Sequence, residues 1–189
     1  MLNSSVLSSI IGDQRLTELI SEDNIKKRIV DIAEDISKKY KGRIPIVIGV
    51  LNGSFLFLAD IVRKLDVEFE VDFIKISSYG SSKTSSGTVR LLKDISVQHI
   101  VTDIRRSYWN VLKDISADIT GRDIILIEDI VDTGLSLKFL KKRFEEAKPN
   151  SLAFVTLLHK AHTSKIDFKI DYIGFEIGDE FVVGYGLDY

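Results

Sequence analysis

Residues that could bind a phosphate and move a proton are concentrated in one short stretch, Ile124–Ser136. An apolar β-branched run opens it, two adjacent carboxylates (Glu128 and Asp129) follow, and Asp132–Ser136 supplies hydroxyls and a glycine. The apolar run is typical of a strand buried on both faces of a parallel sheet. Because Leu135–Ala147 has a helical pattern, backbone N–H groups and hydroxyls would meet at a helix N-terminus, where a phosphate is favoured.

A second unit of the same kind precedes it in the chain. Ile44–Leu51 has the pattern of a buried strand, Asn52-Gly53-Ser54 interrupts it, and Phe55–Leu65 continues as a helix. The carboxyl ends of parallel strands lie at one edge of a sheet, where α/β folds bind ligands. Both small polar loops are therefore expected at that edge.

The rest of the chain supplies the elements that must position these loops. Ser21 followed by acidic residues predicts the start of an amphipathic helix that Gly42 ends. Further strands are predicted at Val6–Ile11, Glu68–Ile76, Thr88–Ile95, Ser151–Leu158 and Tyr172–Ile177. Strands that alternate with helices predict an α/β fold with a sheet rich in parallel strands.

Composition excludes several classes of function. The chain has 189 residues, 44% hydrophobic and 29% charged, which fits a single globular domain. The net charge of −2 gives no overall basic field for nucleic acid. The absence of cysteine excludes disulfides and thiolate zinc sites. With no secretory signal and no apolar window near the ~20 residues that span a bilayer, a cytoplasmic location is expected.

Three further features have both a structural and a functional interpretation. Ser77–Gly87 is rich in serine and glycine, which fits an exposed hairpin loop or a lid that orders over a ligand. Apolar residues at helical spacing predict an inserted amphipathic helix at about 97–115. His159 and His162 could suggest a metal, but without a third ligand nearby the pattern favours a surface loop.

Four motifs in order carry a resemblance to a known family. The segment EDIVDTG at Glu128–Gly134 resembles the phosphoribosyl-diphosphate (PRPP) signature of type I phosphoribosyltransferases. Three further motifs, at Val50–Ile61, Ser77–Ile95 and Ile173–Tyr189, resemble those of the hypoxanthine (hypoxanthine-guanine) phosphoribosyltransferases of purine salvage. The resemblance implies a single domain, 1–189, with a mostly parallel sheet flanked by helices. It also implies a small hood formed by the N- and C-terminal segments and a flexible lid at about 77–89.

The resemblance implies a reaction as well as a fold. Hypoxanthine or guanine would react with PRPP to give IMP or GMP and pyrophosphate, with Mg²⁺ as cofactor. Neither nucleic acid nor membrane would be a partner, and relatives form homodimers or homotetramers. The metal fits the chemistry, because pyrophosphate is a strongly anionic leaving group and Mg²⁺ prefers oxygen ligands.

The acidic residues receive catalytic roles from this resemblance. Glu128 and Asp129 would contact the ribose hydroxyls, and Asp132 would lie near N7 of the purine as general base. Glu128, Asp129 and Asp188 would be the metal ligands, directly or through water. Carboxylates suit a transition state that develops positive charge at the anomeric carbon.

The remaining implied roles concern binding. The 5′-phosphate would lie against Asp132, Thr133, Gly134, Leu135 and Ser136. Leu51, Asn52 and Gly53 would form the pyrophosphate loop, with a cis peptide at its first bond, and Ser78 and Tyr79 would belong to the lid. The base would stack on Phe181, meet the backbone of Val182, and accept a hydrogen bond from Lys160 at its 6-oxo group. A lysine donor favours a 6-oxo over a 6-amino purine.

The sequence also departs from the family pattern. Asn52 stands where many relatives have lysine, the segment at about 97–116 is additional, and the chain stops at Tyr189, where relatives continue with a pyrophosphate-binding arginine. The transferase is the first hypothesis, and the additional segment and the early end of the chain support an alternative, a PRPP- or nucleotide-binding regulator of the same fold with weak or no catalysis. A transferase for xanthine or a pyrimidine fits Lys160 and the C-terminal motif less well. The preferred base and the oligomeric state are left open.

Overall fold

The computed structural model of the chain describes residues 16–78, 89–91 and 119–187. Several sequence predictions lie wholly or partly outside these residues: the strand Val6–Ile11, most of the lid at about 77–89 with Tyr79, both ends of the strand Thr88–Ile95, the inserted helix at about 97–115 and the predicted metal ligand Asp188.

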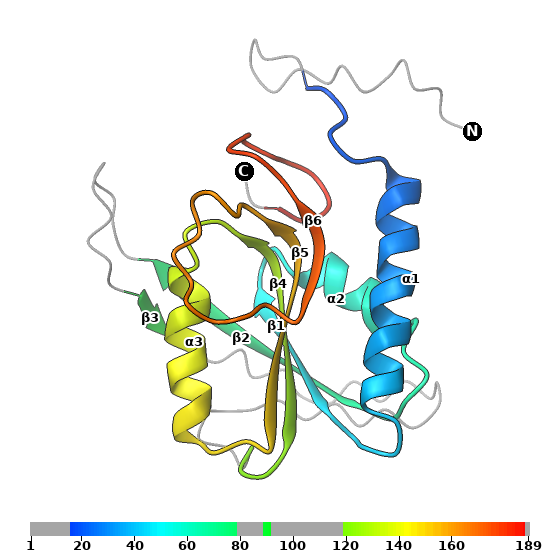
Figure 1. The fold of residues 1–189 in the computed structure, drawn as a ribbon, viewed down its shortest axis with the longest axis vertical. Coiled ribbons are helices and arrows are strands. Elements are labelled where there is room, and N and C mark those ends of the chain that lie inside the picture. The colour runs from blue at the N-terminus through cyan, green and yellow to red at the C-terminus, as the bar shows by residue number, and fades with distance from the viewer. Residues whose placement is uncertain (1–15, 79–88, 92–118, 188–189) are drawn as a thin grey trace.

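A mostly parallel sheet forms the centre of the fold (Figure 1). Its strand order in the described residues is β3-β2-β1-β4-β5-β6. The strands are β1 (Ile46–Leu51), β2 (Glu70–Ser78), β3 (Val89–Leu91), β4 (Asp123–Val131), β5 (Ser151–His159) and β6 (Tyr172–Glu176). Among the strands that the structure describes, β3 alone runs antiparallel to its neighbour β2, and the other pairs are parallel, which confirms the predicted sheet.

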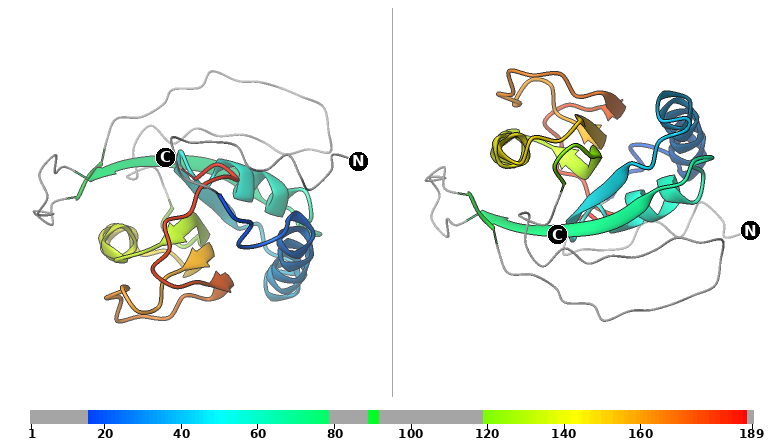
Figure 2. Two further views of the ribbon diagram at one scale, coloured as in Figure 1. Left: turned by 90° about the horizontal axis from the view of Figure 1, so that it is seen from above. Right: turned by 90° about the horizontal axis from the view of Figure 1, so that it is seen from below.

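Helices cover both faces of the sheet (Figures 1 and 2). Helices α1 (Glu22–Lys39) and α2 (Phe55–Val62) pack on one face, and α3 (Leu135–Glu146) packs on the other. None of the helices in the described part of the chain is both long and apolar enough to cross a membrane.

The apolar run of β4 is buried because the strand has a helix layer on each side. Ile125 and Ile127 pack in the core beneath α1 and α2, whereas Ile124 and Leu126 pack in the core beneath α3. Successive side chains of a strand point to opposite faces, so a strand between two layers is apolar at every position. This explains the unbroken pattern read from the sequence.

The ends of some elements differ from prediction. Helix α1 begins after Ser21 as expected, with the Ser21 hydroxyl accepting a hydrogen bond from the Asn24 N–H. Helix α2 ends at Val62 rather than Leu65, because the Lys64 N–H turns back to the Ile61 carbonyl in a tight final turn. Strand β4 extends past the apolar run through both carboxylates, because pairing with β5 continues to Val131.

A carboxylate at the amino end of β4 ties three segments together. One oxygen of Asp123 accepts hydrogen bonds from Asn150 Nδ2 at 2.7 Å and from Ser151 Oγ at 2.6 Å. Arg43 Nη1 lies 3.7 Å from the other oxygen. Burial raises the pKa of Asp123, but the two hydrogen bonds and Arg43 outweigh burial and hold the pKa below its ordinary value.

We predict that Asp123→Asn lowers the free energy of unfolding at pH 7 by about 1.5–3 kcal/mol, the range for hydrogen bonds to a charged group. Because the folded-state pKa is lowered, this stabilisation is present above the unfolded pKa and is lost as pH falls through the folded pKa. Urea unfolding at pH 7, 5, 4 and 3 measures it. The exposed Asp167, paired with Lys138 at 3.5 Å, provides the control Asp167→Asn, for which little change is expected. An equal loss in Asp123→Asn at pH 7 and pH 3 would contradict the assignment.

Candidate active site

Three loops meet at the carboxyl edge of the sheet. They follow β1, β4 and β5, which are adjacent and parallel, so their ends lie side by side. The loops comprise residues 52–54, 132–134 and 160–165. This arrangement confirms that the first two loops share one edge and adds a third loop that the sequence pattern did not single out as a unit.

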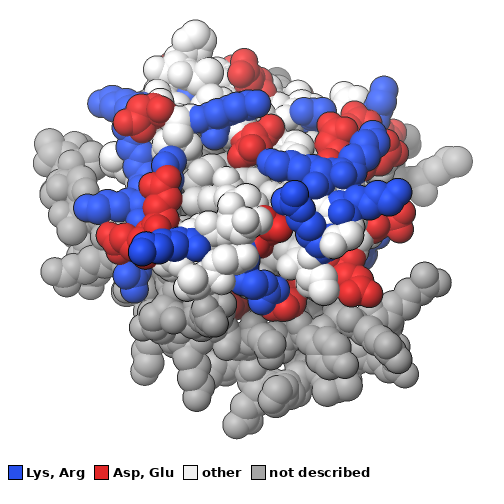
Figure 3. Space-filling view, turned by 60° about the horizontal axis from the view of Figure 1, so that its bottom comes forward, with Lys and Arg blue, Asp and Glu red and all other residues white. Residues whose placement is uncertain are grey.

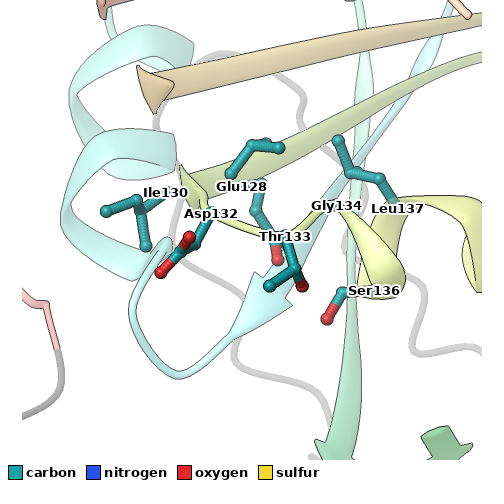
Figure 4. Close-up of a pocket in the computed structure, with 8 residues that line it drawn as sticks. Glu128, Ile130, Asp132, Thr133, Gly134, Ser136 and Leu137 are labelled. Atoms are coloured by element: carbon teal, nitrogen blue, oxygen red, sulfur yellow. The ribbon is translucent and has the colours of Figure 1, made fainter. Parts of the chain in front are cut away.

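The loop between β4 and α3 lines a small pocket of about 110 Å³. Asp132, Thr133 and Ser136 are among its lining residues, and Figure 4 shows them in succession where the strand passes into the helix. Gly134 precedes α3 with a φ of 76°, in the left-handed region that favours glycine. A side chain there would place Cβ 2.3 Å from Ile166 Cγ2, so the close approach also requires glycine.

The third loop, residues 160–165, holds the loop between β4 and α3 in place. We call this loop, residues 132–134, the phosphate-type loop. The Lys160 N–H donates to the Val131 carbonyl at 2.9 Å, and the Lys165 N–H donates to the Thr133 carbonyl at 3.1 Å. The Thr133 side chain is exposed, and its hydroxyl oxygen accepts a long hydrogen bond, 3.5 Å, from the Leu135 N–H. The hydroxyls of Thr133 and Ser136 and the first N–H groups of α3 together make a setting that suits an anion.

The adjacent carboxylates Glu128 and Asp129 occupy different surroundings. Glu128 lines the pocket with Ser136 and Leu137 of α3, whereas Asp129 lies against Gly53 in the loop before α2. This separation follows from the alternation of side chains along a strand. The two acids therefore reach the sheet edge from opposite faces.

Glu128 is the more buried of the two acids. Its Oε2 atom is buried without a hydrogen-bond partner. Burial, and secondarily the charge of Asp129, raise the pKa of Glu128 well above its ordinary value. A buried carboxylate of this kind is stable as the neutral acid or beside a cation.

The loop after β1 has the geometry expected from the sequence. The Leu51–Asn52 peptide bond is cis, as the family resemblance implies. Gly53 is packed so closely that an added Cβ would lie 1.7 Å from Asp129 Oδ2. Ser54 fixes the loop to the end of β1, because its hydroxyl donates to the Val50 carbonyl at 2.6 Å.

Asp132 has partners at both of its carboxylate oxygens. Thr163 Oγ1 donates to Oδ1 at 2.7 Å, and Lys160 Nζ lies 3.6 Å from Oδ2. The Asp132 side chain is 50% exposed, while that of Lys160 is only 11% exposed. A mostly buried ammonium group is therefore directed at a carboxylate that stays open to a ligand.

The C-terminal segment lies against α2 and the loop before it. The Tyr185 hydroxyl donates to Asp60 of α2, and burial together with this carboxylate raises the pKa of Tyr185 above its ordinary value. Gly186 lies so close to the Gly53 carbonyl that an added Cβ would be 2.9 Å from that oxygen. Upstream, the Phe181 side chain is 74% exposed. Val182 is partly buried against the core beneath α1 and α2.

Most of the predicted site residues lie at one edge of the sheet, and two of them are outside the described part of the chain. Ser78 ends β2, which neighbours β1, whereas Tyr79 and Asp188 lie outside the described residues. The sequence interpretation missed Thr163, Asp60 and Tyr185 as contact residues. Thr163 could have been found from its spacing of one turn after Lys160, but no local signal links Asp60 to a residue near the C-terminus.

The prediction of a surface loop at the two histidines was half wrong. His162 is exposed in a turn, but His159 is the last residue of β5, and both its ring nitrogens are buried without hydrogen-bond partners. Pairing with β6 extends the strand this far. Within the described part of the chain, no group of three or more His, Cys, Asp or Glu side chains could hold a metal alone.

We predict that Glu128→Gln removes a pH dependence of stability. Because the folded-state pKa of Glu128 is raised, its contribution is fully present below the unfolded pKa and declines as pH rises toward the folded pKa, by up to about 1.4 kcal/mol per pH unit. The uncharged amide lacks this decline, so the difference in unfolding free energy between variant and parent should shift in favour of the variant as the pH rises above the ordinary pKa of glutamate. Urea unfolding in buffer with EDTA measures the difference, and a difference that is constant with pH would contradict the raised pKa.

Comparisons with known proteins agree with this geometry. The family model described as "Phosphoribosyl transferase domain" matches residues 16–189. The hypoxanthine-guanine phosphoribosyltransferase of Bacillus subtilis is 40% identical over 90% of this chain and 84% of its own length. The hypoxanthine phosphoribosyltransferase of Salmonella typhimurium is 38% identical over 90% of this chain and 86% of its own.

Solved structures give the same result at the level of the fold. A Bacillus anthracis hypoxanthine-guanine phosphoribosyltransferase crystal structure has a TM-score of 0.75 and 40% identity, covering 92% of this chain and 91% of the other. A Staphylococcus aureus hypoxanthine phosphoribosyltransferase has a TM-score of 0.76 and 34% identity, covering 92% and 83%. The chain therefore belongs to the phosphoribosyl transferase family, among relatives that are hypoxanthine and hypoxanthine-guanine phosphoribosyltransferases.

Proposed function

We propose that this chain transfers the phosphoribosyl group of PRPP to hypoxanthine or guanine, giving IMP or GMP and pyrophosphate. The observation that carries the proposal is the position of Asp132. It stands at the start of the phosphate-type loop, with Lys160 and Thr163 at its two oxygens. A carboxylate, an ammonium group and an anion site so close together suit a substrate that has a phosphate at one end and a proton to lose at the other.

The phosphates of PRPP would bind at two loops. The 5′-phosphate would lie at residues 132–136, where N–H groups of α3 and the hydroxyls of Thr133 and Ser136 can donate to it. The pyrophosphate would lie at residues 51–53, whose backbone is held against Asp129. Ser78 and Tyr79 would belong to a lid that excludes water, which protects a cationic ribosyl centre from hydrolysis.

The two strand-end carboxylates would contact the ribose hydroxyls and the metal. Glu128 fits a cation because its buried Oε2 has no hydrogen-bond partner, and Asp129 is its neighbour in sequence. Mg²⁺ is commonly held by one or two carboxylates together with substrate phosphates, which suits this donor set, with Asp188 as a further ligand. When bound, Mg²⁺ supplies positive charge that stabilises the departing pyrophosphate.

The base would bind between the third loop and the C-terminal segment. Phe181, exposed at its position, would stack on the purine, the backbone of Val182 would meet its edge, and Lys160 would donate to the 6-oxo group. N9 of the base would form the bond to the anomeric carbon as the bond to pyrophosphate oxygen breaks. Asp132 would accept the proton that leaves N7.

The chemical class of the base is the first prediction of this proposal. With PRPP and Mg²⁺, nucleotide should form from hypoxanthine or guanine, and much less from adenine, because Lys160 can donate to a 6-oxo group but cannot accept from a 6-amino group. Uracil should also give much less nucleotide, because it lacks the imidazole ring whose N7 and N9 take part in the proposed reaction. Xanthine also has the 6-oxo group, so it tests the edge of the base that would meet the backbone of Val182. Chromatography of the products from the five bases measures this, and PRPP binding with no nucleotide from any base would instead favour a regulator.

The comparisons give no support to the regulator hypothesis, since the relatives described above have the names of transferases. The charges also do not favour a nucleic-acid partner. In the face shown in Figure 3, basic and acidic side chains are intermixed. Several basic residues of α3 are paired with acids, such as Lys141 with Glu145 and Arg143 with Glu146.

We predict that Asp132→Asn lowers kcat much more than it weakens PRPP binding, because the amide keeps the shape of the side chain but cannot accept the N7 proton. General bases contribute about 10²–10⁴-fold to rate, which sets the expected loss. Steady-state kinetics and titration calorimetry with PRPP and Mg²⁺ measure the two effects. An unchanged kcat would remove Asp132 from the role of general base.

A further inference from the structure

We propose that Thr163 is a positioning residue for Asp132. It holds this carboxylate in place when Lys160 leaves Asp132 and binds the base instead. The inference rests on the proposed function, since it takes Asp132 to be the general base. Its starting point is the hydrogen bond from Thr163 Oγ1 to Asp132 Oδ1, which at 2.7 Å has the length of a charge-assisted hydrogen bond.

The loop after β5 is built to direct this hydroxyl at Asp132. The N–H groups of Thr163 and Ser164 both donate to the Lys160 carbonyl, at 3.2 and 3.0 Å, so residues 160–164 form a compact turn. The turn is attached to β4 through the Lys160 N–H and to the phosphate-type loop through the Lys165 N–H. Lys160 and Thr163 therefore approach Asp132 from one rigid segment.

The Thr163 hydroxyl has a single proton, and the distances favour the carboxylate as its acceptor. Thr163 Oγ1 also lies near two backbone carbonyl oxygens, those of Asp132 at 3.4 Å and Lys160 at 3.3 Å. Both distances are longer than is usual for a hydroxyl donor, whereas 2.7 Å is the commonest value. The proton thus belongs to the contact with the acid.

The two partners of Asp132 have different roles. Lys160 Nζ, 3.6 Å from Oδ2, is too far for a short hydrogen bond and acts through its charge. In the proposed reaction this ammonium group turns to the 6-oxo atom of the purine and leaves Oδ2 open toward N7. Because the Asp132 side chain is half exposed, it could rotate when the lysine departs. The bond from Thr163 to Oδ1 keeps Oδ2 directed at the base.

The test is a double-mutant cycle between Thr163 and Asp132. Thr163→Val replaces the hydroxyl by a methyl group of similar size and should lower kcat about tenfold, with the Kd for PRPP within twofold of the parent. Thr163→Ser retains the hydroxyl and should keep kcat within threefold. Thr120→Val, at an exposed threonine in the turn before β4 and at the opposite end of that strand, is the matched control and should leave kcat unchanged.

The cycle separates a positioning role from a structural one. On the residual rate of Asp132→Asn, adding Thr163→Val should have no further effect, since the amide variant no longer has a base to position. An equal loss in both backgrounds, or an equal loss in the valine and serine variants, would overturn the proposal. If Thr163→Val folds poorly by urea unfolding, Thr163→Ala is measured in the same cycle with the same expectation.

The Asp132→Asn variant distinguishes a failure of the positioning role from a failure of the proposed function. If Asp132→Asn loses activity and Thr163→Val does not, the positioning role is wrong and the proposed function stands. If Asp132→Asn retains the parent kcat, the general-base role and the role of Thr163 fall together.

Discussion

The register of β4 between β1 and β5 is the constraint on which the site depends. Gly49 pairs with Ile127 on one side, and Val131 pairs with His159 on the other. These pairings are parallel, so three loops leave the sheet at one edge and can contact one another. A shift by one residue would move each side chain of β4 to the other face. Burial of the strand by helices on both faces makes such a shift costly.

The alternation of side chains along β4 also separates two adjacent carboxylates, Glu128 and Asp129. Two carboxylates adjacent in sequence repel each other, and the charge of Asp129 contributes to the raised pKa of Glu128, but the alternation of side chains along β4 gives them different surroundings. Glu128 enters the layer beneath α3, and Asp129 supports the loop that begins at Asn52. Burial raises the pKa of Glu128. Burial therefore favours the protonated form of Glu128, whereas Asp129 lies in the less buried surroundings of the loop before α2.

Local patterns in the sequence predicted the sheet, the three helices and the phosphate-type loop, because these depend on periodicity, capping and turn residues near in sequence. The family motifs extended this to the cis bond at Leu51, whereas the ion pair of Lys160 with Asp132 was not predicted. The extension of β4 and β5 could not be predicted, because pairing between strands decides where a strand ends. The contact of Thr163 with Asp132 was also missed, because it depends on how two loops meet in space.

The packing of Gly186 against the Gly53 carbonyl has an evolutionary consequence. A methyl group at position 186 would come within 2.9 Å of that oxygen, and one at position 53 would collide with Asp129. Gly186 also has a φ of 86°, which disfavours any other residue. A larger residue at position 186 therefore requires movement of the loop at Gly53, and a larger residue at position 53 requires movement of Asp129 in β4. A substitution at either glycine must therefore be accompanied by a change in a segment that is distant from it in the gene.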